Sequence, residues 1–79
     1  MTQLEERLQV MANETFGMDI EAMREGRSFV ELGIDSLALI EFTLDLQREF
    51  DVPMDEGEVR ADFTIASTAE LLAAKGAAA

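Results

Sequence analysis

Residues 35–50 read Asp-Ser-Leu-Ala-Leu-Ile-Glu-Phe-Thr-Leu-Asp-Leu-Gln-Arg-Glu-Phe and carry the strongest helical pattern of the chain. Asp35 suits the N-cap, because its carboxylate can accept a hydrogen bond from a free N–H group of the first turn. When the residues are placed at about 100° intervals around a helix, one side is apolar. We predict that this side is a buried core stripe, formed by Leu39, Phe42, Thr43, Leu46 and Phe50.

The opposite side of the same helix is also partly apolar. It carries three apolar residues among three charged ones, namely Leu37, Ile40 and Leu44 with Glu41, Asp45 and Arg48. A helix in a bundle of 79 residues can hardly bury both sides, and exposed apolar residues rimmed by charge are typical of interaction sites. Two interpretations stay open: this side binds partner proteins, or residues 17–34 fold over it and cover it.

The chain before residue 35 divides into a helix and a loop. A capping box starts at Thr2, and apolar residues then recur at helical spacing, so we predict a first helix from Thr2 to Thr15. Residues 17–34 show no sustained period and are predicted to form a long loop, in which Ser28 and Glu31 could cap one helical turn. The apolar side chains that should pin this loop to the core are Met18, Ile20, Phe29, Leu32 and Ile34.

The chain after residue 50 predicts one short helix and one longer helix. The short helix is placed at Glu56–Ala61. The last helix should begin at Thr64, or about three residues later if Ser67 is the cap instead, and should stop at Gly76. No stretch alternates with a period of two. The predicted fold is therefore all-α, a small four-helix bundle of three main helices and one short helix, in one domain over residues 1–79.

The composition excludes several classes of protein. Apolar residues make up 48% of the chain, which is too many for a disordered acidic tail. The absence of cysteine and histidine excludes disulfides, the usual zinc sites and a Ser-His-Asp hydrolase. No apolar run approaches the roughly 18 residues of a membrane span, and the N-terminus lacks the basic and apolar regions of a secretory signal. We therefore expect a cytoplasmic monomer that is not membrane-bound.

The acidic residues are concentrated in the middle of the chain. The net charge is −11, and residues 31–62 hold ten acids against two bases, Arg48 and Arg60. Such a surface repels polyanions, so nucleic-acid binding is not expected. The same field attracts basic protein surfaces and speeds their docking, although acidic residues can also serve solubility alone.

The sequence allows three alternative functions, namely a calcium-binding loop, a Ser-Lys catalytic pair and a helix-groove interaction module. Residues 51–62 have the length of a calcium-binding loop, but Pro53, Glu56 and Asp62 stand where a ligand, a turn glycine and a bidentate glutamate are required. We therefore predict no metal site. A Ser-Lys catalytic pair could use only Lys75, far along the chain. A helix-groove interaction module without any covalent group remains possible, since it too would explain exposed Leu37, Ile40 and Leu44.

The stretch Leu32-Gly33-Ile34-Asp35-Ser36-Leu37 resembles the phosphopantetheine attachment motif of the acyl carrier protein family. Glu41, the helix ending Leu-Gln-Arg-Glu-Phe-Asp, the acidic segment after Pro53 and the Thr64-Ile65 helix start also resemble that family. The resemblance extends from the first helix to about residue 75 and implies a four-helix fold. It also implies a covalent 4'-phosphopantetheine arm, which a phosphopantetheinyl transferase donates from coenzyme A and on which acyl groups are carried as thioesters.

By its position in this motif, Ser36 is implied to be the attachment residue, and Asp35 belongs to the motif that the transferase engages. The chain is then a non-catalytic carrier without catalytic residues of its own. The expected partners are the transferase and an acyltransferase, ketosynthase or acyl-loading ligase with a basic docking surface. The partner-binding residues that we predict on the outer side of the helix are Leu37, Ile40, Glu41, Leu44 and Asp45.

Within the family, Gly33-Ile34-Asp35-Ser36-Leu37 followed by Ala38-Leu39-Ile40 is more similar to polyketide carriers than to the housekeeping fatty-acid carrier, which usually has an acid directly after Asp-Ser-Leu. Peptidyl carriers more often have Gly-Gly before Asp-Ser. We therefore expect a carrier of polyketide or related specialised-metabolite biosynthesis, with fatty-acid and peptidyl or aminoacyl carriers as alternatives. The initiator-like Met1 favours a free-standing protein, and the sequence does not identify the acyl cargo.

Overall fold

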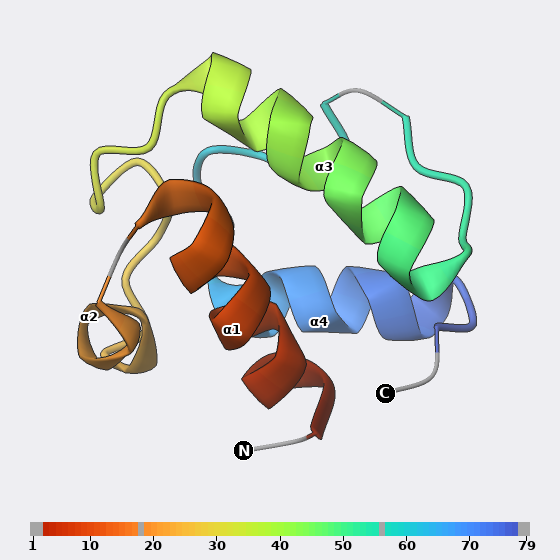
Figure 1. The fold of residues 1–79 in the computed structure, drawn as a ribbon, viewed down its shortest axis with the longest axis horizontal. Coiled ribbons are helices and arrows are strands. Elements are labelled where there is room, and N and C mark those ends of the chain that lie inside the picture. The colour runs from red at the N-terminus through yellow and green to blue at the C-terminus, as the bar shows by residue number, and fades with distance from the viewer. Residues whose placement is uncertain (1–2, 18, 56, 78–79) are drawn as a thin grey trace.

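The computed structural model describes residues 3–17, 19–55 and 57–77, and it contains four helices and no strand in these ranges. The helices are α1 (Gln3–Phe16), α2 (Ile20–Arg24), α3 (Ser36–Phe50) and α4 (Ile65–Ala74) (Figure 1). Helix α1 packs against each of the other three. The fold is the predicted all-α bundle of three main helices and one short helix.

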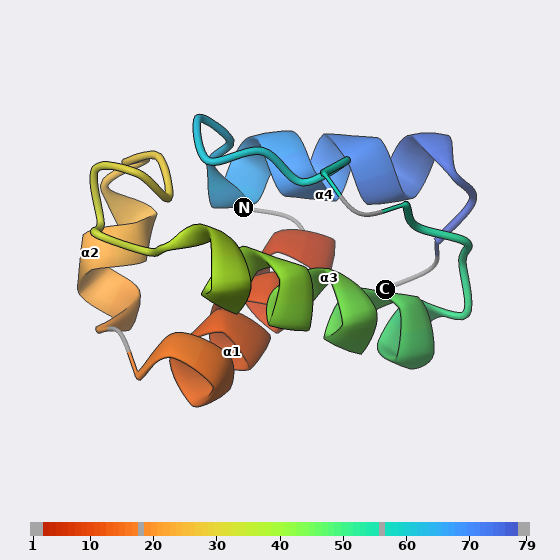
Figure 2. The same ribbon diagram turned by 90° about the horizontal axis from the view of Figure 1, so that it is seen from above.

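The segment between α3 and α4 determines what lies beside the N-terminal end of α3. Figures 1 and 2 show this segment leaving the C-terminal end of α3, running back along that helix and entering α4 near the other end of the molecule. The chain between α2 and α3 lies at that same end. Residues from two loops that are distant in the sequence therefore meet beside the start of α3.

The core stripe predicted on α3 is confirmed. Leu39, Phe42, Thr43 and Leu46 are buried, and Phe50 is partly buried against the core. Thr43 is accommodated there because its hydroxyl donates to the Leu39 carbonyl oxygen at 2.8 Å. The rings of Phe16, Phe29 and Phe42 contact one another with centroid separations of 5.0–6.2 Å, so they tie α1 and the loop before α3 to the centre of the bundle.

The observed end of α1 and start of α4 lie at or next to the positions that the sequence predicted. The first helix ends at Phe16, one residue after the predicted end, and Thr2 lies outside the described residues. Thr64 is the N-cap of α4, since its Oγ1 accepts a hydrogen bond from the Ser67 N–H group at 3.1 Å. The competing cap at Ser67 was therefore wrong.

The short helix was predicted at the wrong place. The described residues between 57 and 61 form turns and bends, and Gly57 has φ of +86°, which is incompatible with a continuing α-helix. The short helix of the bundle is α2, inside the stretch predicted as a loop, and the Asp19 carboxylate caps it by accepting from the Glu21 N–H group. The rest of that loop is pinned as predicted by Phe29, Leu32 and Ile34. Met18 and the side chain of Ile20 lie outside what the structure describes.

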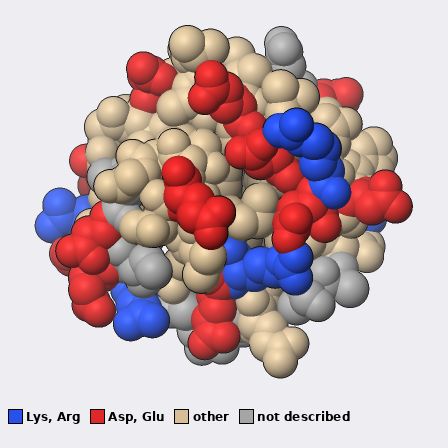
Figure 3. All heavy atoms as spheres, viewed as in Figure 1, with Lys and Arg blue, Asp and Glu red and all other residues tan. Residues whose placement is uncertain are grey.

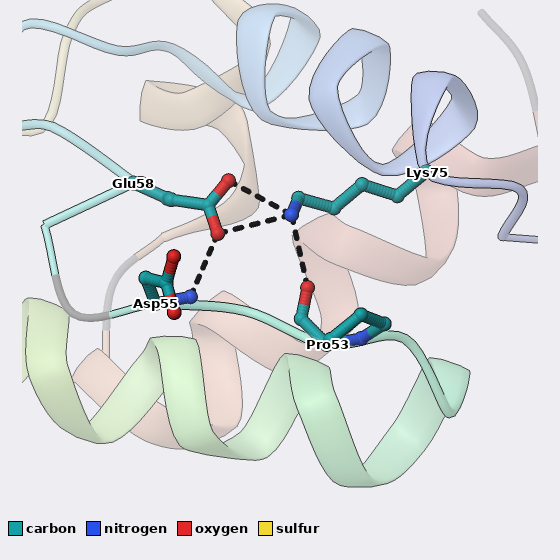
Figure 4. A network of polar contacts seen from close by, with 4 residues as sticks. All are labelled: Pro53, Asp55, Glu58 and Lys75. Carbon is teal, nitrogen blue, oxygen red and sulfur yellow. Dashed lines mark hydrogen bonds and ion pairs between the residues drawn. The ribbon is translucent and has the colours of Figure 1, made fainter.

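Lys75 fastens the segment after α3 to the end of α4 (Figure 4). Its Nζ lies 2.8 Å from Glu58 Oε2 and donates to the Pro53 carbonyl oxygen at 2.9 Å. Glu58 Oε1 also accepts the Asp55 N–H group at 2.7 Å. One carboxylate thus closes its own turn and joins it to α4. These side chains are only about a quarter exposed, so the ion pair is better shielded than the surface pairs elsewhere in the chain.

We expect Glu58→Gln to lower the melting temperature at pH 7, and the difference from wild type to vanish on acidification. The Asp55 N–H group and then Lys75 hold the pKa of the Glu58 carboxyl below its ordinary value of 4.5. A lowered folded-state pKa gives stability that is present above about pH 4.5 and is lost as the pH falls through the folded pKa. Melting curves from pH 7 to pH 3 test this, with Glu70→Gln on an exposed position of α4 as the control. A difference that stayed constant with pH would contradict it.

Candidate functional site

The start of α3 is built by a compact turn over residues 28–35. The Ser28 N–H and hydroxyl groups donate to the Glu31 carboxylate at 2.9 and 3.1 Å, and the Glu31 N–H group donates back to Ser28 Oγ at 3.3 Å. This reciprocal pair is the capped turn that the sequence predicted, and it lowers the pKa of the Glu31 carboxyl. Gly33 follows with φ of +79°, a conformation that favours glycine and turns the chain toward α3.

Asp35 is the N-cap of α3, as predicted. Its backbone is extended, and its Oδ1 accepts a hydrogen bond from the Ala38 N–H group at 2.9 Å. Ser36 is the first helical residue and its side chain is exposed. The N–H groups of Ser36 and Leu37 remain at the positive end of the helix, where an anion is stabilised.

Ser36 differs from the other hydroxyl residues of the described chain in having no hydrogen-bond partner. Each of the others is engaged with a neighbouring side chain or carbonyl group. These pairs are Thr15 with Asp45, Ser28 with Glu31, Thr43 with Leu39, Thr64 with Ser67, and Thr68 with Thr64. Ser36 is also the only one of the three serines that is classed as exposed rather than partly buried. Its hydroxyl is therefore the one most available to an external reagent.

An open groove of about 710 Å³ runs beside Ser36. One side is formed by Val30 and by α3, and the other by the segment after α3. The described lining residues are Val30, Ser36, Leu39, Ile40 and Thr43 on the first side and Gly57, Val59, Arg60, Ala61 and Asp62 on the second. The two sides are joined by hydrogen bonds from the Val30 N–H group to the Ala61 carbonyl oxygen at 2.7 Å and from Phe29 to Phe63 at 2.9 Å. Local sequence signals did not indicate this second side, because the pairing spans about thirty residues.

The five residues predicted to bind partners occupy three different environments. Leu37 and Leu44 are 65% and 48% exposed, and Glu41 is exposed between them. The alternative that residues 17–34 cover this side is therefore wrong. Ile40 is half-buried and lines the groove instead of the outer surface.

Asp45 is engaged within the protein. Its carboxylate accepts hydrogen bonds from Arg48 Nη2 at 2.5 Å and from Thr15 Oγ1 at 3.2 Å, so it links α3 to α1. Figure 3 shows acidic side chains, with basic ones among them, on the face of the molecule that is seen in Figure 1. Because Asp45 is partly neutralised and half-buried, Glu41 is the freer carboxylate on the predicted partner side.

The lysine that a Ser-Lys pair would need is engaged away from Ser36. Lys75, the only lysine of the sequence, binds Glu58 and the Pro53 carbonyl group beyond the C-terminal end of α3, whereas Ser36 starts that helix. Among residues 3–17, 19–55 and 57–77, there is no group of three or more acidic side chains that could hold a metal ion.

No helix in these ranges is long and apolar enough to cross a membrane.

The fold and the start of α3 define a small helical domain that presents a free serine hydroxyl at a helix N-terminus. The sequence model of the family described as "Phosphopantetheine attachment site" matches residues 6–74, which is most of the chain. The protein belongs to this family, the domain family of acyl carrier proteins, whose members bind 4'-phosphopantetheine covalently and are in general not catalytic. No solved structure matches the chain.

Proposed function

We propose that this protein, taken as one carrier domain over residues 1–79, tethers acyl intermediates as thioesters on a phosphopantetheine arm at Ser36. The observation that carries this proposal is the free, exposed Ser36 hydroxyl at the start of α3, since the other described hydroxyl groups are hydrogen bonded. A phosphodiester at this position would lie at the positive end of the helix dipole. No described side chain forms a hydrogen bond with the Ser36 hydroxyl, and the neighbouring Asp35 carboxylate accepts the Ala38 N–H group. We therefore expect the transferase to remove the proton.

The pathway is proposed from the residues around the serine. Ala38-Leu39-Ile40 directly after Asp35-Ser36-Leu37 favours polyketide or related specialised-metabolite biosynthesis. The partners would then be a phosphopantetheinyl transferase and an acyltransferase, ketosynthase or acyl-loading ligase. We expect the carrier to meet them as a cytoplasmic monomer. Its acidic surface suits basic docking sites on these enzymes.

Loading with coenzyme A and a phosphopantetheinyl transferase tests the attachment. Intact mass should increase by one phosphopantetheine group per chain, and tandem mass spectrometry should place it on Ser36. Attachment to Ser28 or Ser67, or no attachment with several transferases, would contradict the proposal. The same experiment separates a carrier from an acidic interaction module, which would bind partners without gaining mass.

We expect Glu41→Lys to slow loading by up to about fivefold, as is usual for a single exposed charge at the rim of an interface. Glu41 is exposed between Leu37 and Leu44 on the outer side of α3, the helix whose first residue is Ser36. The difference from wild type should shrink as salt shortens the reach of the charge. The melting temperature should stay nearly unchanged.

The matched control is Glu70→Lys, which reverses an exposed charge on α4, away from this side of α3. Loading rates measured at low and high salt should change for Glu41→Lys and stay close to wild type for Glu70→Lys. Equal slowing by both variants would mean that total charge matters and that Glu41 has no special role in docking.

A further inference from the structure

The groove beside Ser36 contains one positive charge. Among the described residues that line it, Arg60 is the only base and Asp62 the only acid. The other base in the acidic region of residues 31–62 is Arg48, which pairs with Asp45 and lines other surface hollows. Arg60 is therefore the cation on the groove side that faces the start of α3.

The backbone of Arg60 is held firmly on both sides. Val59 is 3% exposed, so it anchors the chain in the core directly before Arg60. The Ala61 carbonyl oxygen directly after it accepts the Val30 N–H group at 2.7 Å. Further upstream, Glu58 is fixed to Lys75. Arg60 thus projects from an immobilised piece of chain, while its own side chain is 68% exposed.

Most donors of the Arg60 guanidinium are uncommitted to a strong partner. Its Nε donates to Asp62 Oδ1 at 3.3 Å, and both side chains of this pair are about two-thirds exposed. Such a pair contributes little and exchanges partners easily. A guanidinium has five N–H donors in a planar fork, and this geometry matches the oxygens of a phosphate.

We propose that Arg60 is a positioning residue that binds the phosphate group esterified to Ser36 and so directs the start of the arm along the groove. This inference rests on the proposed attachment at Ser36. A phosphodiester there brings a negative charge into a groove that already contains Asp62 and adjoins Asp35. Arg60 is the only base among the described residues that line this groove, so it is the group that can offset the charge. Arg60 would exchange its weak contact with Asp62 for a charge-assisted contact with the phosphate.

Nuclear magnetic resonance of the unmodified and loaded protein tests this inference. In wild type, we expect the Arg60 Nε–H signal to shift on loading while the Arg48 signal does not. We expect Arg60→Gln to narrow the ³¹P line of the loaded protein, because the phosphate becomes more mobile. Arg60→Lys should have an intermediate effect, since it keeps the charge and loses the fork. The difference between wild type and Arg60→Gln should shrink at high salt.

Arg48→Gln is the matched control, because it removes an exposed arginine that does not line the groove. It should leave the ³¹P line as in wild type. An unchanged Arg60 signal on loading, or equal ³¹P effects of Arg60→Gln and Arg48→Gln, would overturn this inference alone if the mass spectrum places the arm on Ser36. Attachment elsewhere would overturn the proposed function and this inference with it.

Discussion

The Phe42→Ala variant should lose about 3–5 kcal/mol of folding free energy, the usual cost of truncating a fully buried phenylalanine. Phe42 is 0% exposed, and its ring contacts those of Phe16 and Phe29. A chain of 79 residues has a total stability on the order of 4–12 kcal/mol, so the variant should be close to unfolding at room temperature. Urea or thermal denaturation followed by circular dichroism measures this loss.

Leu44→Ala is the matched comparison, because Leu44 lies two residues further along the same helix and is 48% exposed. Its truncation should cost less than about 1 kcal/mol, as for most surface substitutions. It should instead weaken loading, if Leu44 contacts the transferase as proposed. Equal destabilisation by the two variants would mean that the two sides of α3 have been assigned to the wrong roles.

The sequence predicted those parts of the fold whose signals are local and repeated. In α3, fifteen residues are enough for the helical period to separate the Leu39–Phe42–Leu46 stripe from the side that carries Leu37 and Leu44. Caps are local too, because the Asp35 and Thr64 side chains bond to N–H groups three residues ahead. The resemblance to the carrier family rested on the Leu32–Leu37 motif and on the order of the elements around it, and the family match over residues 6–74 confirms it.

The sequence analysis placed the short helix at the wrong position. The sequence signal of the true helix is brief, and the contact that shapes the chain around Glu58 joins residues distant in the sequence. Helix α2 has five residues, little more than one turn, so no period can emerge, although Asp19 was a readable cap. A short helix was instead predicted over Glu56–Ala61. The observed conformation is instead held by Lys75, which lies seventeen residues away. A contact between distant residues overrode the local preference.

In the candidate site too, the sequence predicted the features that depend on neighbouring residues and missed those that depend on distant ones. The motif singled out Asp35 and Ser36, and the structure places both at the first turn of α3. The groove could not be predicted, because its second side reaches Ser36 only through the pairing of Val30 with Ala61. Nor could helical periodicity distinguish Glu41, which is free, from Asp45, which binds Thr15 of another helix.

The Ser36→Ala variant should lose all phosphopantetheine loading and yet fold as wild type does. The loss should be complete because alanine has no oxygen to form the phosphodiester. The fold should persist because the Ser36 side chain is exposed and makes no hydrogen bond that the variant would break. An exposed substitution of this kind changes stability by no more than about 0.5 kcal/mol. Intact mass after loading and a melting curve give the two readouts on one sample.

Ser28→Ala and Ser67→Ala are the matched controls, since they remove the other two serines of the chain. Both should load fully. Ser28→Ala should also lower the melting temperature, because it breaks the reciprocal hydrogen bonds with Glu31 that shape the turn before α3; loss of such a cap costs about 1 kcal/mol. Ser36→Ala should therefore lose loading and keep its stability, whereas Ser28→Ala should keep loading and lose stability. Phosphopantetheine on Ser36→Ala, or a loading defect that follows stability across the three variants, would refute the assignment of Ser36.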